Sequence, residues 1–208
     1  MRKMYLSAPL PFVGQKRMLA KEFMKVLEQY PDGTLFVDLF GGSGLLSHIT
    51  KSLKPHSTVI YNDFDNYRFR MKHIPQTNQL LADIREMVGN SVPRHKIIKG
   101  ELRERIFSRI EQEENSTGYV DFITLSSSIL FSMKYKLSVQ DMRKEALYNN
   151  IRKTGYPECT DYLEGLEIVS CDYKEVFNRY KDIPGVVFLV DPPYLSTDVG
   201  TYNMYWNM

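Results

Sequence analysis

Short apolar runs occur near both ends of the chain, and each one stops at a polar or acidic residue. They cover Thr34–Asp38, Thr58–Asn62, Leu166–Ser170 and Val186–Val190. The last run contains no polar residue and ends at an acid followed by two prolines, which cannot donate the hydrogen bonds of a strand. An unbroken apolar run of this kind predicts a strand that is covered on both faces, as in a parallel sheet.

Amphipathic helical patterns alternate with these runs at the two ends of the chain, but not in its middle. Helices are predicted at 16–30, 45–53, 75–88, 100–114, 120–133 and 173–180. The alternation of strands and helices predicts an α/β fold with a Rossmann-like sheet, formed by residues 1–92 and 160–208. Residues 93–159 are predicted to form an inserted, mostly helical subdomain.

Composition narrows the classes of protein that this chain can belong to. It has 208 residues and a formal net charge of +2, so a nucleic-acid partner would have to be contacted by a local basic patch. Two cysteines, Cys159 and Cys171, are too few for a disulfide framework or a zinc site, and we predict no metal. Neither an N-terminal leader pattern nor a membrane-spanning segment is present, which predicts a soluble, intracellular protein.

Candidate ligand-binding residues follow the first three predicted strands. The glycine-rich stretch 40–44 would let a ligand approach the backbone, although it matches neither a dinucleotide-binding nor a P-loop pattern. Asp63 lies about twenty residues further on, where an acid can accept the hydroxyl groups of a ribose. Asp172 ends the third run. Helix capping is the alternative role for both acids. Near Asp63 we assign the cap to Asp65 or Asn66, whereas Asp172 could itself cap the helix that follows it.

The fourth run ends in Asp191-Pro192-Pro193-Tyr194, a sequence suited to chemistry on an amino group attached to a flat ring. The lone pair of such an amine is delocalised into the ring. The Asp191 carboxylate can accept one of its N–H groups and the Pro192 carbonyl the other, which draws the nitrogen toward tetrahedral geometry. Tyr194 offers a ring face for stacking an extruded base. A purely structural Pro-Pro turn is the alternative interpretation.

This tetrapeptide resembles the catalytic motif of S-adenosylmethionine-dependent amino-methyltransferases. The whole chain is similar to Dam-type DNA adenine methylases, the D12 class or alpha group, in the order of its motifs. The resemblance implies S-adenosyl-L-methionine as cofactor and a flipped adenine in double-stranded DNA as substrate, with Asp191, Pro192, Pro193 and Tyr194 as catalytic residues. In that family, the segment matching residues 11–16 closes over the methionine end of the cofactor. The resemblance implies that Lys16 neutralises the carboxylate of the cofactor and that Asp172 contacts its adenine. The implied cofactor-binding residues are Phe12, Gly14, Lys16, Asp38, Phe40, Gly41, Gly42, Ser43, Gly44, Asp63, Phe64, Cys171, Asp172, Tyr173 and Asp191.

The inserted subdomain is the predicted DNA-binding region. Residues 94–153 hold twelve Lys and Arg against eight Asp and Glu, a net charge of +4, which leaves −2 for the rest of the chain. Cations for phosphates and amides for base edges predict a surface that faces duplex DNA, with an ordinary solvated helical face as the alternative. In Dam-type enzymes the target-recognition domain stands at this place in the chain. The predicted DNA-binding residues are Lys134, Lys136, Arg143, Lys144, Asn149, Asn150, Arg152 and Lys153.

Other interpretations stay open at this point. A cytosine-N4 or RNA-adenine methyltransferase would use the same tetrapeptide, and a nicotinamide-dependent dehydrogenase is disfavoured by the glycine pattern. Only fourteen residues follow Tyr194, so we expect the C-terminal strands of the family's sheet to be missing. An inactive fragment that binds DNA or the cofactor is therefore a further alternative. The resemblance also indicates a cytoplasmic protein of bacterial or phage origin and leaves open a cognate restriction endonuclease as a partner.

Overall fold

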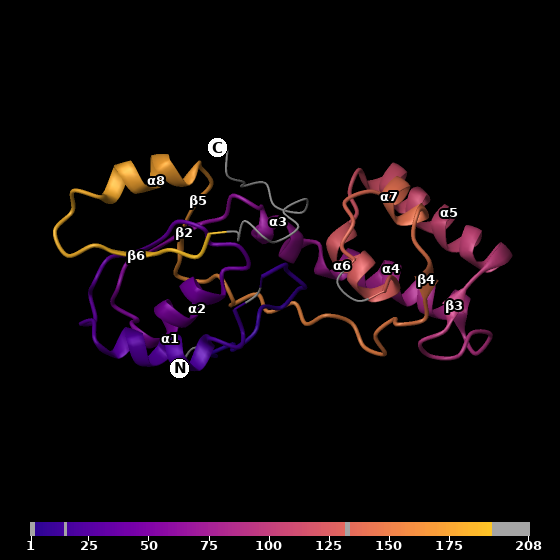
Figure 1. Cartoon of the computed structure of the whole chain (residues 1–208), viewed down its shortest axis with the longest axis horizontal. Coiled ribbons are helices and arrows are strands. Elements are labelled where there is room, and N and C mark those ends of the chain that lie inside the picture. The colour runs from indigo at the N-terminus through magenta and orange to yellow at the C-terminus, as the bar shows by residue number, and fades with distance from the viewer. Residues whose placement is uncertain (1–2, 15, 132–133, 193–208) are drawn as a thin grey trace. The chain divides into compact units, whose positions relative to one another are not determined.

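The computed structural model describes residues 3–14, 16–131 and 134–192, which fold into two compact units (Figure 1). Unit 1 combines residues 1–69 with 159–208, and unit 2 consists of residues 70–158. Unit 2 thus lies, in sequence, between the two parts of unit 1. The short helix α3 (Tyr67–Lys72) begins in one unit and ends in the other.

Unit 1 is built on a sheet in which the described residues form four parallel strands, in the order β5-β2-β1-β6. The strands are β1 (Phe36–Asp38), β2 (Val59–Asn62), β5 (Glu167–Val169) and β6 (Val187–Leu189). Each lies within an apolar run that the sequence predicts to be a strand. The two central strands are buried along their whole length, as expected of a parallel sheet. The coverage predicted for the last run is only partial, since Val190 is 61% exposed.

Helices cover both faces of this sheet because alternate side chains of each strand point to opposite sides. Phe36 and Val59 pack with α1 (Ala20–Glu28) and α2 (Leu45–Leu53). Val37 and Ile60 pack on the other face with Val176 of α8 (Tyr173–Tyr180). Figure 1 shows α8 on one side of the strands and α1 and α2 on the other. Each of these buried apolar side chains stabilises the layer by about 1.5–3 kcal/mol.

Unit 2 is mostly helical. It consists of α4 (Ile74–Val88), α5 (Gly100–Thr117), α6 (Phe122–Ile129), α7 (Val139–Arg143) and a short antiparallel ribbon of β3 (Ile97–Ile98) and β4 (Leu147–Tyr148). The helix α5 packs against α4 and α7, and α6 packs against α4.

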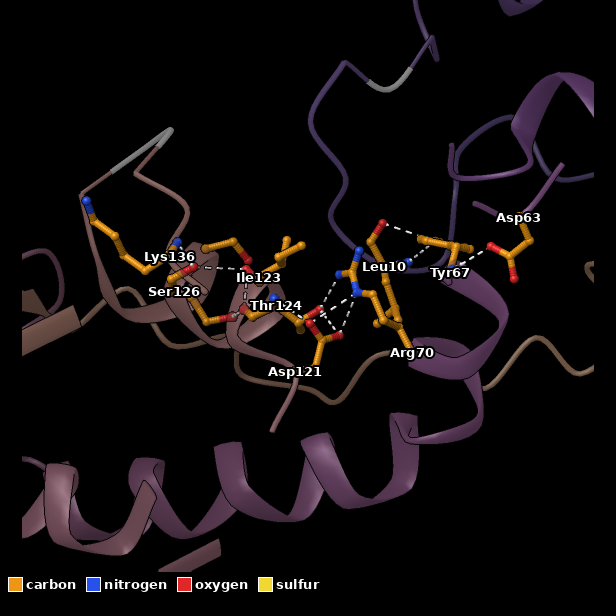
Figure 2. Close-up of polar contacts among 11 residues, drawn as sticks. Leu10, Asp63, Tyr67, Arg70, Asp121, Ile123, Thr124, Ser126 and Lys136 are labelled. Atoms are coloured by element: carbon orange, nitrogen blue, oxygen red, sulfur yellow. Dashed lines mark hydrogen bonds and ion pairs between the residues drawn. The ribbon is translucent and has the colours of Figure 1, made fainter. Parts of the chain in front are cut away.

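A buried ion pair stands at the start of α6. The Asp121 side chain accepts a hydrogen bond from the Thr124 amide, which caps the helix, and it also pairs with Arg70 at 3.1 Å. Figure 2 shows the Arg70 side chain directed at Asp121 and Thr124. Because both ions are buried, removing either partner would leave an uncompensated charge.

The structure divides the chain at a different residue from the one that the sequence predicts. The boundary lies between Phe69 and Arg70, whereas the sequence predicts it after residue 92, because α4 packs on α5 and α6. The short elements α7, β3 and β4 were not predicted, since two to five residues are too few to show a period. None of the described helices is long and apolar enough to cross a membrane.

Candidate active site

The candidate site lies at the carboxyl ends of β1 and β6. The chain continues from β1 to β2 on one side, whereas β6 flanks β1 on the other, so the strand order reverses between β1 and β6. In open α/β sheets, ligands bind in the crevice outside such a reversal. Asp38 ends β1, and Asp191 follows β6 by two residues. The structure therefore brings two predicted site acids to one point.

Lys16 pairs with Asp191 at this point. Its Nζ lies 3.0 Å from Oδ1 of Asp191, and the two side chains are 15% and 24% exposed. The helix predicted from residue 16 begins only at Ala20, so Lys16 belongs to the turn before it. The pair thus joins the segment 11–16 to the predicted catalytic acid.

Asp38 is the most deeply buried acid of the site, with 1% exposure. Its Oδ2 accepts a hydrogen bond from the Ser47 hydroxyl at 2.7 Å, while Oδ1 has no hydrogen-bond partner among the described residues. Burial raises the pKa of Asp38 to about 7; the Ser47 hydrogen bond opposes this shift and the neighbouring charge of Asp191 adds to it. A buried carboxyl oxygen without a partner favours a donor or a cation brought by a ligand.

The glycine-rich turn 40–44 packs closely against its own unit. A Cβ atom at Gly41 would lie 2.3 Å from the Tyr61 ring and 2.6 Å from the Asn62 carbonyl oxygen. Gly42 and Gly44 have φ angles of +51° and +72°, which side chains with a Cβ rarely adopt. Ser43 is buried, and Phe40 is half-buried. Glycine is needed here for packing and backbone conformation, in addition to any ligand.

Phe12 and Gly14 precede Lys16 in the segment 11–16. The Phe12 ring lies over the glycine turn, where a Cβ at Gly42 would be 3.0 Å from its Cε1 atom. Gly14 is exposed, with a φ angle of +72°. Phe12, which belongs to the segment predicted to close over the cofactor, therefore lies against the glycine turn.

Asn62 is a site residue that sequence reasoning missed. It is buried at the end of β2, and its Nδ2 donates to the carbonyls of Leu39 and Cys171, at 3.0 and 2.9 Å. Its Oδ1 accepts from the Cys171 amide at 3.1 Å. One side chain thus joins the backbone after β1 to the backbone after β5. A polar residue at the end of an apolar strand was the only signal of this role.

Asp63 caps the helix beside the site, a role that the sequence prediction gave to Asp65 or Asn66. Its two carboxylate oxygens accept from the amides of Tyr67, at 2.6 Å, and Arg68, at 3.0 Å. The Tyr61 hydroxyl donates to Oδ1 at 3.1 Å. Burial raises the pKa of Asp63, and these hydrogen bonds oppose that shift. Since a carboxylate has about four acceptor sites, about one is left for a ligand.

The Tyr67 side chain holds the N-terminal segment in place. Its hydroxyl accepts from the Leu10 amide at 2.9 Å and donates to the Leu10 carbonyl at 3.2 Å. Figure 2 shows Leu10, Tyr67 and Asp63 in a row. The cap at Asp63 and the position of the segment 11–16 are therefore set by the same residue. Phe64, the next predicted cofactor residue, is half-buried after Asp63.

The third acid, Asp172, caps α8. It accepts from the Lys174 amide at 2.8 Å and is exposed. The Tyr173 ring packs on that of Phe40, with centroids 4.8 Å apart. The residues predicted to flank the cofactor after β1 and β5, Cys171 included, thus lie together. Pro192 is half-buried next to Asp191, and the predicted catalytic residues Pro193 and Tyr194 lie outside the described residues.

In unit 2, four of the predicted DNA-binding cations form ion pairs. Lys134 and Lys136 both pair with Glu145. Lys144 pairs with Asp141, and Arg143 pairs with Glu104 and Glu111. Their charge is therefore compensated within the unit.

The other predicted DNA-binding residues lie just after β4. Asn149 is buried and donates to the Val92 carbonyl, whereas Asn150 is half-buried. Arg152 is exposed, with its guanidinium 4.4 Å from the centroid of the Tyr156 ring, and Lys153 is exposed. Among the described residues, no group of three or more His, Cys, Asp or Glu is placed to hold a metal ion.

Two comparisons connect this geometry to known proteins. The sequence model of the D12 class N6 adenine-specific DNA methyltransferases matches residues 12–208. The chain is also 40% identical, over 205 residues, to a Haemophilus influenzae protein named "Putative methyltransferase". That match covers 97% of this chain and 68% of the relative.

Proposed function

Because the chain belongs to the D12 class N6 adenine-specific DNA methyltransferase family, we propose that it methylates the N6 atom of adenine in DNA, with S-adenosylmethionine as methyl donor. The observation that carries this proposal is the pairing of Asp191 with Lys16 beside the buried Asp38, at the point where the strand order reverses. The family defines the reaction, and these residues supply groups for it.

The site has groups that fit the cofactor. The unpartnered Oδ1 of Asp38 suits a cationic or hydrogen-bond-donating group, and the backbone of the glycine turn is free of side chains at three positions. Asp63 would accept one ribose hydroxyl through its remaining acceptor site, and Asp172 the adenine amino group. When bound, the cofactor supplies a methyl group that is already activated on a sulfonium.

Asp191 would hold the target amine. Lys16 occupies its Oδ1, so we assign Oδ2 to one N6–H of the adenine and the Pro192 carbonyl to the other. The adenine must leave the base stack to reach these acceptors, and Tyr194 is the ring we assign to stack on it. Catalysis in this arrangement is chiefly alignment of the amine with the methyl group.

The decisive assay supplies labelled S-adenosylmethionine and unmethylated DNA of mixed sequence to the full chain, followed by mass spectrometry of the nucleosides. We expect N6-methyladenine. Asp191→Asn should lower the rate on the order of 100-fold or more while changing cofactor affinity little. Asp182→Asn, which alters an exposed acid before β6, is the matched control. N4-methylcytosine as product, or near-normal turnover by Asp191→Asn, would refute the proposal.

A further inference from the structure

Tyr61 packs against the glycine turn 40–44. It is fully buried in β2, and its ring lies next to two glycines of the turn. A Cβ at Gly41 would lie 2.3 Å from its Cε2 atom, and one at Gly44 would lie 3.3 Å from its Cζ atom. A phenylalanine ring would make the same contacts, so packing alone does not explain why this residue carries a hydroxyl.

The hydroxyl of Tyr61 joins the glycine turn to Asp63. It lies 2.8 Å from the carbonyl oxygen of Gly42 and 3.1 Å from Oδ1 of Asp63. Both oxygens are acceptors, and they share the one proton that the hydroxyl can donate. Burial and the neighbouring charge of Asp63 raise the pKa of Tyr61 well above its ordinary value, so the proton stays on this hydroxyl. Without it, the two acceptor oxygens would lie close together with no donor between them.

The same hydroxyl decides which oxygen of Asp63 can receive a ligand. Oδ1 accepts from the Tyr67 amide at 2.6 Å as well as from Tyr61. Among the described residues, Oδ2 accepts from the Arg68 amide alone, at 3.0 Å. Each carboxylate oxygen has about two acceptor positions. Oδ1 is therefore filled, and the remaining position of Asp63 is on Oδ2.

We propose that Tyr61 is a positioning residue for the cofactor. Its hydroxyl fixes the spacing between the glycine turn and Asp63, and it directs the one ribose hydroxyl that Asp63 accepts to Oδ2. Tyr61 acts through these two groups. This inference rests on the proposed function, because the ligand is the cofactor assigned there.

The test uses ligands that differ at the ribose alone. S-adenosylhomocysteine and its 2′-deoxy and 3′-deoxy analogues are titrated into wild type, Tyr61→Phe and Tyr5→Phe, and calorimetry gives each Kd. Tyr61→Phe keeps the ring and loses the hydroxyl. Tyr5→Phe is the matched control, because it also removes a hydroxyl that donates to an acid of unit 1, here Asp161 at 2.7 Å, which is outside the candidate site.

The two ribose hydroxyls should contribute unequally in wild type. We expect one deoxy analogue to bind at least about tenfold weaker than the other, because Asp63 has room for one hydroxyl only. In Tyr61→Phe, S-adenosylhomocysteine should bind about tenfold weaker than in wild type. The two analogues should then differ by about threefold or less, since Oδ1 has a position for the second hydroxyl. Tyr5→Phe should keep both the wild-type affinity and the wild-type difference.

Equal weakening by the two analogues in wild type would overturn the inference without any variant. So would a loss in Tyr61→Phe that is the same for all three ligands, which is what a packing residue would give. Wild-type affinities in Tyr61→Phe would overturn it as well. Circular dichroism at the temperature of the titration ensures that a loss of binding is not mistaken for unfolding.

Failure of the inference and failure of the proposed function are distinguishable. A wild type that shows the expected affinities but makes no N6-methyladenine would overturn the proposed function alone. A wild type that makes N6-methyladenine, while Tyr61→Phe binds all three ligands as wild type does, would overturn the inference alone. A wild type without measurable affinity for S-adenosylhomocysteine would overturn both.

Discussion

The role of Asn62 leads to a sharp prediction, because one side chain connects two separate parts of the candidate cofactor site. Replacing Asn62 with Ala would remove three hydrogen bonds, to the carbonyl of Leu39 and to the carbonyl and amide of Cys171. A buried backbone group left without a partner costs about 1–3 kcal/mol. Cys171 is half-exposed, so water can replace part of the loss there. We therefore expect Asn62→Ala to lower the free energy of unfolding by about 2–4 kcal/mol.

Unit 2 offers a matched control. Asn78 binds the backbone of one residue in the same way, with Nδ2 donating to the Tyr156 carbonyl at 2.8 Å and Oδ1 accepting from the Tyr156 amide at 2.7 Å. Asn78→Ala should also destabilise the protein, by about 2 kcal/mol. It joins no strand ends of the sheet, so it should leave cofactor affinity unchanged.

The assay has two readouts for each variant. Urea unfolding followed by circular dichroism gives the stability, and isothermal titration gives the affinity for S-adenosylmethionine under conditions where both variants are folded. We expect Asn62→Ala to weaken cofactor binding about tenfold or more, because the segments at Phe40 and Asp172 would lose their fixed spacing. If Asn62→Ala lost stability to the same degree as Asn78→Ala yet bound the cofactor as wild type does, Asn62 would be a structural residue only.

Two further predictions concern the same crevice. Gly41→Ala should destabilise the protein by about 1–3 kcal/mol and abolish cofactor binding, because its Cβ would overlap Tyr61 and the Asn62 carbonyl. Gly33→Ala is the control for destabilisation alone, since a Cβ there meets no atom within 4 Å but the φ angle of +98° strains any residue other than glycine. A similar loss of cofactor binding in both variants would refute the packing argument. Burial raises the pKa of Asp38 from 3.8 to about 7, so the folded chain holds a proton there that the unfolded chain releases. Stability should therefore fall as pH rises from about 4 to about 7, by up to about 4 kcal/mol, and Asp38→Asn should lack this loss. If urea unfolding gave parallel curves of stability against pH for wild type and Asp38→Asn, the role of Asp38 in this loss of stability would be refuted.

The sequence predicted the sheet well because each strand is a short apolar run with a polar end. The regions 34–38, 58–62, 166–170 and 186–190 each contain one observed strand, and the helices 45–53 and 173–180 match α2 and α8. These elements were predictable because each follows from a local pattern of apolar and polar residues. Their pairing order, which places Asp38 beside Asp191, was not evident from any one pattern.

The residues that hold the site together were harder to predict. Asn62 and Tyr67 make their hydrogen bonds to backbone groups far away in sequence, and such groups carry no sequence signal. The capping role of Asp63 was not predicted, because Asp63, Asp65 and Asn66 are all suitable caps by type. The acidic partners of the basic pairs near α7 were not predictable from the sequence either. These partners, Glu104, Glu111 and Glu145, stand on other elements or outside the pairs, so only the fold shows the compensation.

The electrostatics of the crevice favour a cationic ligand. Asp38 and Asp191 stand at the ends of the adjacent strands β1 and β6. Among the described residues, Lys16 forms an ion pair with Asp191, and no base forms one with Asp38. Asp38 thus stays buried beside a second carboxylate, and its pKa rises for that reason as well as through burial. A positively charged group placed at its unpartnered Oδ1 would relieve both effects at once. A ligand with positive charge gains from this arrangement, and S-adenosylmethionine carries such charge on its sulfonium and ammonium groups.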